Sequence, residues 1–195
     1  MANANRPTGL SPVRTLSGAP WNQQANLYSI AAAYDTALAI GDPVISSGTA
    51  DSKGILGIEL AADTGAIRGV IVGLGTKEGL IANPSNLDIT YRPANDPAEW
   101  YALVVDDPNT VFEVQDSGTT AITLGQMGLN TNLVSGSNNG FVSGWTVDAA
   151  DAGTTSTLQV KLLGLSQRID NTPGVNQKVL VKINNHELAA GTAGL

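Results

Sequence analysis

The only histidine, His186, is the first residue to consider for catalysis, and Glu187 follows it directly. One histidine is enough for a Ser-His-Asp triad, but a multi-histidine metal site needs more. The sequence contains no Gly-x-Ser-x-Gly motif or other nucleophile pattern to accompany it. Asn184 and Asn185 precede the histidine, just after an expected strand. We therefore expect His186 to lie in a polar turn or an interface contact and to take no part in catalysis.

Paired carboxylates occur at Asp106 and Asp107. Two carboxyl groups held ~5–9 Å apart across a cleft can hydrolyse a glycosidic bond. Here they begin the sequence Asp-Asp-Pro-Asn, which is typical of a tight turn whose side chains bond to the backbone. Asp148 and Asp151 do not have the spacing of an EF-hand loop, and a solvated turn is favoured over a weak Ca²⁺ site. The sequence predicts no catalytic residue and no metal site.

A glycine-rich stretch at Gly73, Gly75 and Gly79 is similar to a dinucleotide-binding motif. The third glycine comes one residue late, and Pro84 leaves no room for the helix that would hold a pyrophosphate. A turn between strands is the favoured interpretation, and we expect no cofactor.

Three tryptophans, Trp21, Trp100 and Trp145, are the residues that could stack against a sugar ring. Trp100 lies in the most apolar expected strand, so we expect it in the core. Trp145 follows a glycine and could be exposed, and Trp21 is an aromatic residue that could anchor the chain in a partner. Core or interface packing is the favoured interpretation of all three. A carbohydrate-binding β module stays the alternative.

The composition is that of a folded β protein with few charges. The chain has no cysteine, and charged residues make up 14% of it, against roughly 25% in a typical protein. The N-terminal residues show no apolar region of a secretory signal, and no apolar run approaches the ~18 residues of a membrane-spanning helix. We expect no membrane association.

Charge is unevenly distributed along the sequence. Residues 35–157 hold fifteen acidic against four basic residues, a net charge of −11, whereas residues 1–34 and 158–195 each carry a net charge of +2. An acidic body argues against nucleic-acid binding, which requires a basic stripe. The basic ends either contact a partner or fold onto the acidic body, and the sequence leaves both possibilities open.

Residues 1–26 are predicted to form an extended N-terminal arm, followed by a single β-rich body at 27–195 with a short C-terminal tail. Pro7, Pro12 and Pro20 interrupt any helix in the arm. Its apolar residues, too many for a freely solvated tail, are Leu10, Val13, Leu16 and Trp21. We expect the arm to lie along a surface, its own or a partner's, and to contribute little to the fold of the body.

The body has short strand candidates every 8–14 residues, separated by glycine, proline and asparagine turns. This pattern predicts an all-β fold, a β-barrel or a jelly-roll sandwich, with less than about 15% helix. The clearest expected hairpin joins residues 100–105 to residues 111–115 through the turn at 106–109.

Several segments resemble the head cement (decoration) proteins of short-tailed bacteriophages. In the order of the chain they are 6–14 (RPTGLSPVR), 18–22 (GAPWN), 25–28 (ANLY), 40–44 (IGDPV), 83–87 (NPSNL), 91–93 (YRP), 100–101 (WY), 105–108 (VDDP), 183–186 (INNH) and 191–194 (GTAG). The arm segments are more specific than the Gly-Asp-Pro-Val turn.

The resemblance implies a structural virion protein, made in the host bacterial cytoplasm, that binds the outer face of the capsid and stabilises the head. The implied partners are the major capsid protein and further copies of the chain, as a dimer or trimer. It implies no catalytic residues. Another virion component, such as a head fibre base or a tail protein, is the alternative within this class.

Together, the arm, the basic ends and the polar turn suggest which residues meet the capsid or a neighbouring copy. Eight are expected to do so: Arg6, Leu10, Val13, Arg14, Trp21, Lys178, Lys182 and His186. The four cations are the residues expected to meet capsid carboxylates.

Overall fold

The computed structural model describes residues 3–76, 89–191 and 194. The described residues form β-strands and one short 3₁₀ turn, η2 (Leu124–Gln126), with no α-helix. The prediction of an all-β fold with little helix is therefore confirmed. Within the described part of the chain, no helix is long and apolar enough to cross a membrane. Gly79 and Pro84 of the glycine-rich stretch lie outside the described residues.

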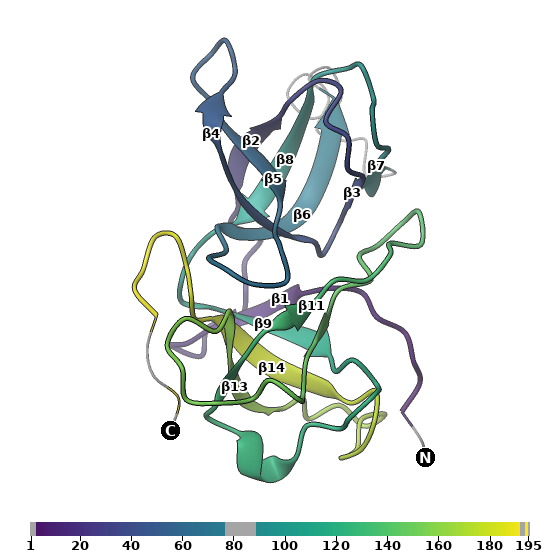
Figure 1. The fold of residues 1–195 in the computed structure, drawn as a ribbon, viewed down its shortest axis with the longest axis vertical. Coiled ribbons are helices and arrows are strands. Elements are labelled where there is room, and N and C mark those ends of the chain that lie inside the picture. The colour runs from purple at the N-terminus through teal and green to yellow at the C-terminus, as the bar shows by residue number, and fades with distance from the viewer. Residues whose placement is uncertain (1–2, 77–88, 192–193, 195) are drawn as a thin grey trace.

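Five strands close into a barrel, which is the upper half of Figure 1. In order around the barrel they are β2 (Asn26–Ile30), β5 (Leu56–Leu60), β4 (Pro43–Ala50), β6 (Gly69–Thr76) and β8 (Trp100–Val105). Two short strands, β3 (Leu38–Ala39) and β7 (Tyr91–Arg92), pair with each other. Ile30, Ile58 and Ile71 fill the barrel together with Trp100, which is buried as predicted.

A second, five-stranded sheet forms the lower half of Figure 1, and all its neighbouring strands are antiparallel. Its order is β1 (Ser11–Thr15), β9 (Thr110–Gln115), β14 (Lys178–Ile183), β13 (Val160–Leu165) and β10 (Asn130–Thr131). A small pair, β11 (Leu133–Val134) with β12 (Thr146–Val147), lies beside it.

The expected hairpin of residues 100–105 with residues 111–115 is wrong, although both strands are present. β8 pairs with β2 and β6 in the barrel, and β9 pairs with β1 and β14 in the sheet. Residues 106–109 carry the chain from one half of the molecule to the other. Both strands are mostly buried, and each already has a partner on both edges, so no free edge is left for the other.

One apolar core extends across the boundary between the two halves. It joins Ile67, Val70 and Val105 on the barrel side to Phe112 and Val181 on the sheet side. Trp145, which could have been exposed, is 2% exposed within this same core. The barrel therefore has its own apolar interior and also shares a second apolar cluster with the sheet, which we call the shared core.

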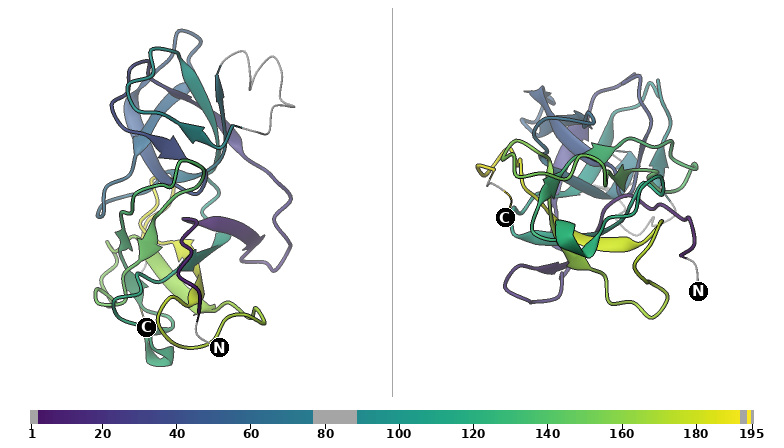
Figure 2. Two further views of the ribbon diagram at one scale, coloured as in Figure 1. Left: turned by 90° about the vertical axis from the view of Figure 1, so that its right-hand side faces the viewer. Right: turned by 60° about the horizontal axis from the view of Figure 1, so that its bottom comes forward.

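The N-terminal segment lies along the chain's own body. β1 pairs with β9, and Leu10 is 1% exposed within the shared core. Gly9 has a φ of +66°, and a Cβ atom there would come within 2.3 Å of the carbonyl oxygen of Gly41, so only glycine fits. The segment then runs along the outside of the molecule to β2 (Figure 2). Part of the segment expected to be an arm therefore belongs to the core, because the side chain of Leu10 packs among the apolar residues of the body.

Candidate interaction face on the five-stranded sheet

The five-stranded sheet has one buried face and one partly exposed face, because successive side chains of a strand point to opposite sides. In β14, Val179, Val181 and Ile183 are buried, whereas Lys178, Leu180 and Lys182 are partly exposed. The alternation continues in β13, where Val160 and Leu162 are buried and Lys161 and Leu163 are partly exposed. We call the partly exposed side the outer face of the sheet.

A row of cations crosses the outer face. Lys161 is directly opposite Lys182, and Val111 of β9 is directly opposite both Lys182 and Arg14. Directly opposite residues share a face, so Arg14, Lys182 and Lys161 form one row across four strands, about 14 Å long at the usual strand spacing. Val111 is buried although it belongs to neither apolar core. This agrees with the aliphatic parts of the Arg14 and Lys182 side chains lying over it.

The row has an electrostatic cost for the isolated protein. Two like charges directly opposite each other destabilise a sheet. The pKa of Lys161 lies below its ordinary value, first because of partial burial and second because of the positive charge on Lys182.

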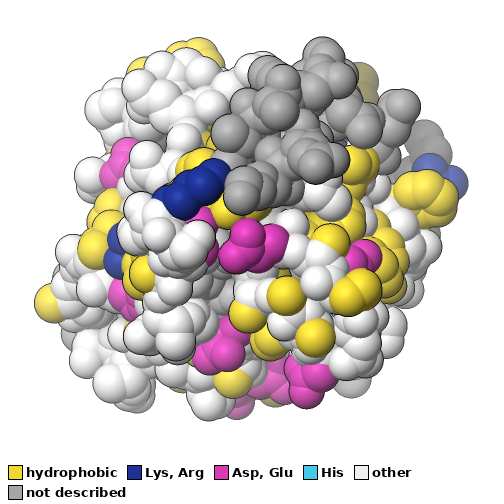
Figure 3. Space-filling view, turned by 90° about the horizontal axis from the view of Figure 1, so that it is seen from above, with side chains coloured by type: hydrophobic (Ala, Val, Ile, Leu, Met, Phe, Trp, Pro, Cys, Tyr) yellow, Lys and Arg dark blue, Asp and Glu magenta, His cyan; other side chains and the backbone are white. Residues whose placement is uncertain are grey.

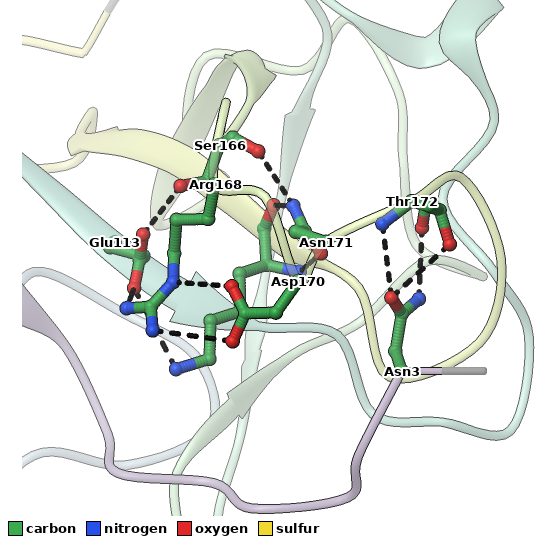
Figure 4. A network of polar contacts seen from close by, with 8 residues as sticks. Asn3, Glu113, Ser166, Arg168, Asp170, Asn171 and Thr172 are labelled. Carbon is green, nitrogen blue, oxygen red and sulfur yellow. Dashed lines mark hydrogen bonds and ion pairs between the residues drawn. The ribbon is translucent and has the colours of Figure 1, made fainter. Parts of the chain in front are cut away.

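Two further cations lie at the other end of the outer face, around Glu113 (Figure 4). Its Oε1 is 3.2 Å from Nη1 of Arg168 and 3.7 Å from Nζ of Lys178. Arg168 also donates from Nε to Oδ1 of Asp170, at 3.0 Å. The hydroxyl of Ser166 donates to Oε2 of Glu113, at 2.5 Å. Glu113 is thus shared by two cations and a hydroxyl.

The outer face is basic although the protein is acidic. Five cations (Arg14, Lys161, Arg168, Lys178 and Lys182) stand against two acids (Glu113 and Asp170), a formal charge of +3, while the whole chain carries −7. Viewed from the barrel end, acidic side chains are visible among apolar, uncharged and a few basic ones (Figure 3). The outer face therefore carries a positive charge, and the rest of the chain carries the excess of acidic residues.

The structure brings some of the predicted contact residues together. Arg14, Lys178 and Lys182 share the outer face, and Val13 is exposed on β1 beside Arg14. Arg6 is exposed, and its backbone nitrogen donates to the side chain of Gln115 at 2.8 Å, at the end of β9. Trp21 lies beside β1, where its backbone nitrogen donates to the carbonyl of Val13 at 3.2 Å. It is half-buried against the shared core, and its Nε1 donates to the carbonyl of Gln24 at 3.2 Å.

Two predicted contact residues are corrected, because Leu10 and His186 are 1% and 4% exposed and cannot reach a neighbour. His186 joins the two halves of the molecule through its backbone, which forms a bridge with Ile67. Its Nδ1 accepts a hydrogen bond from the backbone nitrogen of Leu188 at 3.0 Å, and burial lowers its pKa. Its Nε2 has no hydrogen-bond partner among the described residues, so no triad is assembled there.

Asp106 has a different place from the one expected. Asp107 does serve the turn, accepting from the backbone nitrogen of Asn109 at 2.9 Å. Asp106 instead accepts from the Tyr28 hydroxyl at 2.5 Å and from Nδ2 of Asn26 at 2.8 Å. Arg68 lies 3.9 Å from it.

The contacts of Arg68 continue this network across the two halves. Its Nη1 is 3.8 Å from Glu187, which accepts from the backbone and the hydroxyl of Ser46 in β4. The network ties the barrel to the segment after β14 and is a structural contact. Within the described ranges, no group of three or more His, Asp and Glu side chains is placed to hold a metal ion.

Sequence reasoning missed Lys161 and Arg168 as members of the face. The alternation of Lys178 and Lys182 with buried valines is a local signal and was sufficient for β14. The position of Lys161 opposite Lys182 depends on the register of two strands, which local spacing does not encode. Comparison of the chain with protein-family models, with curated proteins and with solved structures gave no match.

Proposed function

We propose that the chain is a structural virion protein, a capsid cement protein that binds the outer face of the major capsid lattice and stabilises the head without catalysis. The resemblance of its sequence to head cement proteins suggests the partner. The cation row of Arg14, Lys182 and Lys161 suggests which face of the protein binds it. This row is the single observation that carries the proposal.

The partner surface on the shell is acidic, because the outer face carries a formal charge of +3. A single exposed ion pair contributes only about 0–1 kcal/mol. Binding therefore depends on several pairs together and on burial of the partly exposed Leu163 and Leu180 between them. A dimer or trimer that engages two or more shell subunits gains further affinity from effective concentration.

The rest of the molecule, which carries the excess of acidic residues, faces water in this arrangement. Like-charged outer surfaces keep finished particles from associating. The tryptophans do not support the alternative of a sugar-binding platform, because Trp100 and Trp145 are 7% and 2% exposed.

Co-sedimentation with phage heads assembled without this protein tests the proposal. We expect the wild-type protein to sediment with the heads and to raise their resistance to heat and denaturant. Because the ion pairs are screened by salt, binding should weaken as the salt concentration rises. Absence of co-sedimentation at low salt would contradict the proposal.

Two charge-reversal variants test whether the outer face of the sheet is the surface that binds the heads. Lys182→Glu should weaken binding at least about threefold, since it reverses one charge of the row in every copy of a multivalent assembly. Lys53→Glu makes the same change on an exposed residue between β4 and β5 of the barrel and should have no effect. Equal loss of binding in both variants would mean that net charge, and not this face, governs attachment.

A further inference from the structure

The loop at 166–177, which joins β13 to β14, is fixed at both ends by hydrogen bonds. Asn171 donates to the backbone carbonyls of Ser166 and Lys178, each at 2.8 Å, and accepts from the backbone nitrogen of Lys178 at 2.8 Å. Asn3 reaches the same loop from the N-terminal segment. It donates to the carbonyl of Thr172 at 2.8 Å and accepts from the backbone nitrogen of Thr172 at 3.0 Å (Figure 4).

The tip of this loop holds an isoleucine entirely in water. Ile169 is fully exposed, more than any other large apolar residue in the described part of the chain. Its two neighbours are fixed to each other, because the Arg168 guanidinium donates to both carboxylate oxygens of Asp170, at 3.0 and 3.4 Å. Arg168 in turn contacts Glu113 on the outer face of the sheet. The isoleucine is therefore held in a defined place beside the basic face.

A single exposed apolar residue is ordinary, but one held in place is not explained by folding. Ordering a side chain or loop at the moment of binding costs free energy, and a loop ordered beforehand avoids that cost. A short apolar anchor next to cations fits an apolar pocket surrounded by carboxylates. The anchor supplies buried area, and the cations supply orientation.

We infer that Ile169 is a pre-organised anchor beside the outer face of the sheet. It inserts into an apolar pocket within an acidic patch of the shell surface. The inference rests on the proposed function and adds an apolar contact to those that the cations make. Charge favours the shell over the same face of another copy, because two basic faces repel each other. The competing binding site for Ile169 and the outer face is the acidic surface of a second copy.

The test is a titration of the same heads with wild-type protein and with Ile169→Ala. We expect the variant to keep the wild-type melting temperature, because its side chain makes no buried contact, and to bind on the order of tenfold more weakly. Phe141→Ala is the matched control, since Phe141 is also exposed but lies on the loop before β12. It should bind as the wild-type protein does.

Asp170→Asn separates anchoring from charge. It removes a negative charge from the face, so electrostatics alone predicts tighter binding. It also weakens the contact that fixes Arg168, so a pre-organised anchor predicts binding several-fold weaker. Tighter binding of Asp170→Asn would overturn the inference.

The remaining outcomes are distinct. If the wild-type protein does not bind heads, the proposed function fails. If it binds and Ile169→Ala binds equally well, only the anchor fails. Sedimentation of the free protein tests whether Ile169 binds a second copy instead. Self-association that Ile169→Ala abolishes would show that it does and would overturn the inference.

Discussion

Asp42 is a carboxylate that the fold keeps out of water. It is 3% exposed, and its Oδ2 accepts a hydrogen bond from the backbone nitrogen of Ala39 at 2.7 Å. Burial raises its pKa from 3.8 to about 6, against the opposing effects of hydrogen bonds from Ser143 and Ala39. Between these two pH values the folded state holds a proton that the unfolded state releases. The contribution of Asp42 to stability is therefore full below pH ~4 and is lost as the pH rises through ~6.

Asp42→Asn should remove this pH dependence. The amide is neutral and keeps an oxygen to accept from Ala39. At pH 8 the variant should be about 1–3 kcal/mol more stable than the wild-type protein, and at pH 4 the difference should nearly disappear. Urea denaturation at both pH values measures it. A difference of the same size at both pH values would show that Asp42 is not the group that titrates.

Arg92 is a buried cation bound to backbone carbonyls. It is 0% exposed, and its Nη1 donates to the carbonyls of Tyr34, Thr36 and Pro93 at 3.1–3.2 Å. Arg92→Met should lower the free energy of unfolding by about 3 kcal/mol or more, because those oxygens lose their donor. Lys53→Met, at an exposed site, should change it by less than about 0.5 kcal/mol. Equal stability of the two variants in chemical denaturation would contradict this account.

At the scale of elements, β1 is part of the folded body. Leu10 precedes it in the shared core, so Leu10→Ala should cost about 2–4 kcal/mol. Deleting residues 1–16 should lower the melting temperature by several degrees or more, since it also removes β1 from β9. Thermal unfolding of both variants checks the expectation. An unchanged melting temperature after the deletion would show that residues 1–16 form an independent arm.

The sequence was a good guide to strand positions and a poor one to strand partners. Residues 100–105 and 111–115 agree closely with β8 and β9, because runs of β-branched and aromatic residues bounded by turn formers are local signals. Pairing depends on distant contacts, so the apparent hairpin was divided between barrel and sheet. The outer face was half visible for the same reason: Lys178 and Lys182 follow the alternation of one strand, but Lys161 joins them only through the register of β13 with β14.

At the scale of the whole molecule, the shared core implies that barrel and sheet unfold together. Val70 and Val105 of the barrel belong to the same apolar cluster as Phe112 and Val181 of the sheet. Differential scanning calorimetry should therefore give one transition, with calorimetric and van't Hoff enthalpies in agreement. Two resolved transitions would mean that the halves are independent domains.

The pairing of β1 with β9 also sets the order in which the chain can fold while it is being made. Pro12 is opposite Phe112, so the first strand waits for its partner while about 100 further residues are synthesised. At ~5–20 residues per second this takes roughly 5–20 s. During that interval the native neighbours of β1 are limited to residues 19–21, which turn back and bond to it. Pro7, Pro12 and Pro20, which lack the amide hydrogen that strand pairing requires, make this segment a poor template for pairing with another nascent chain.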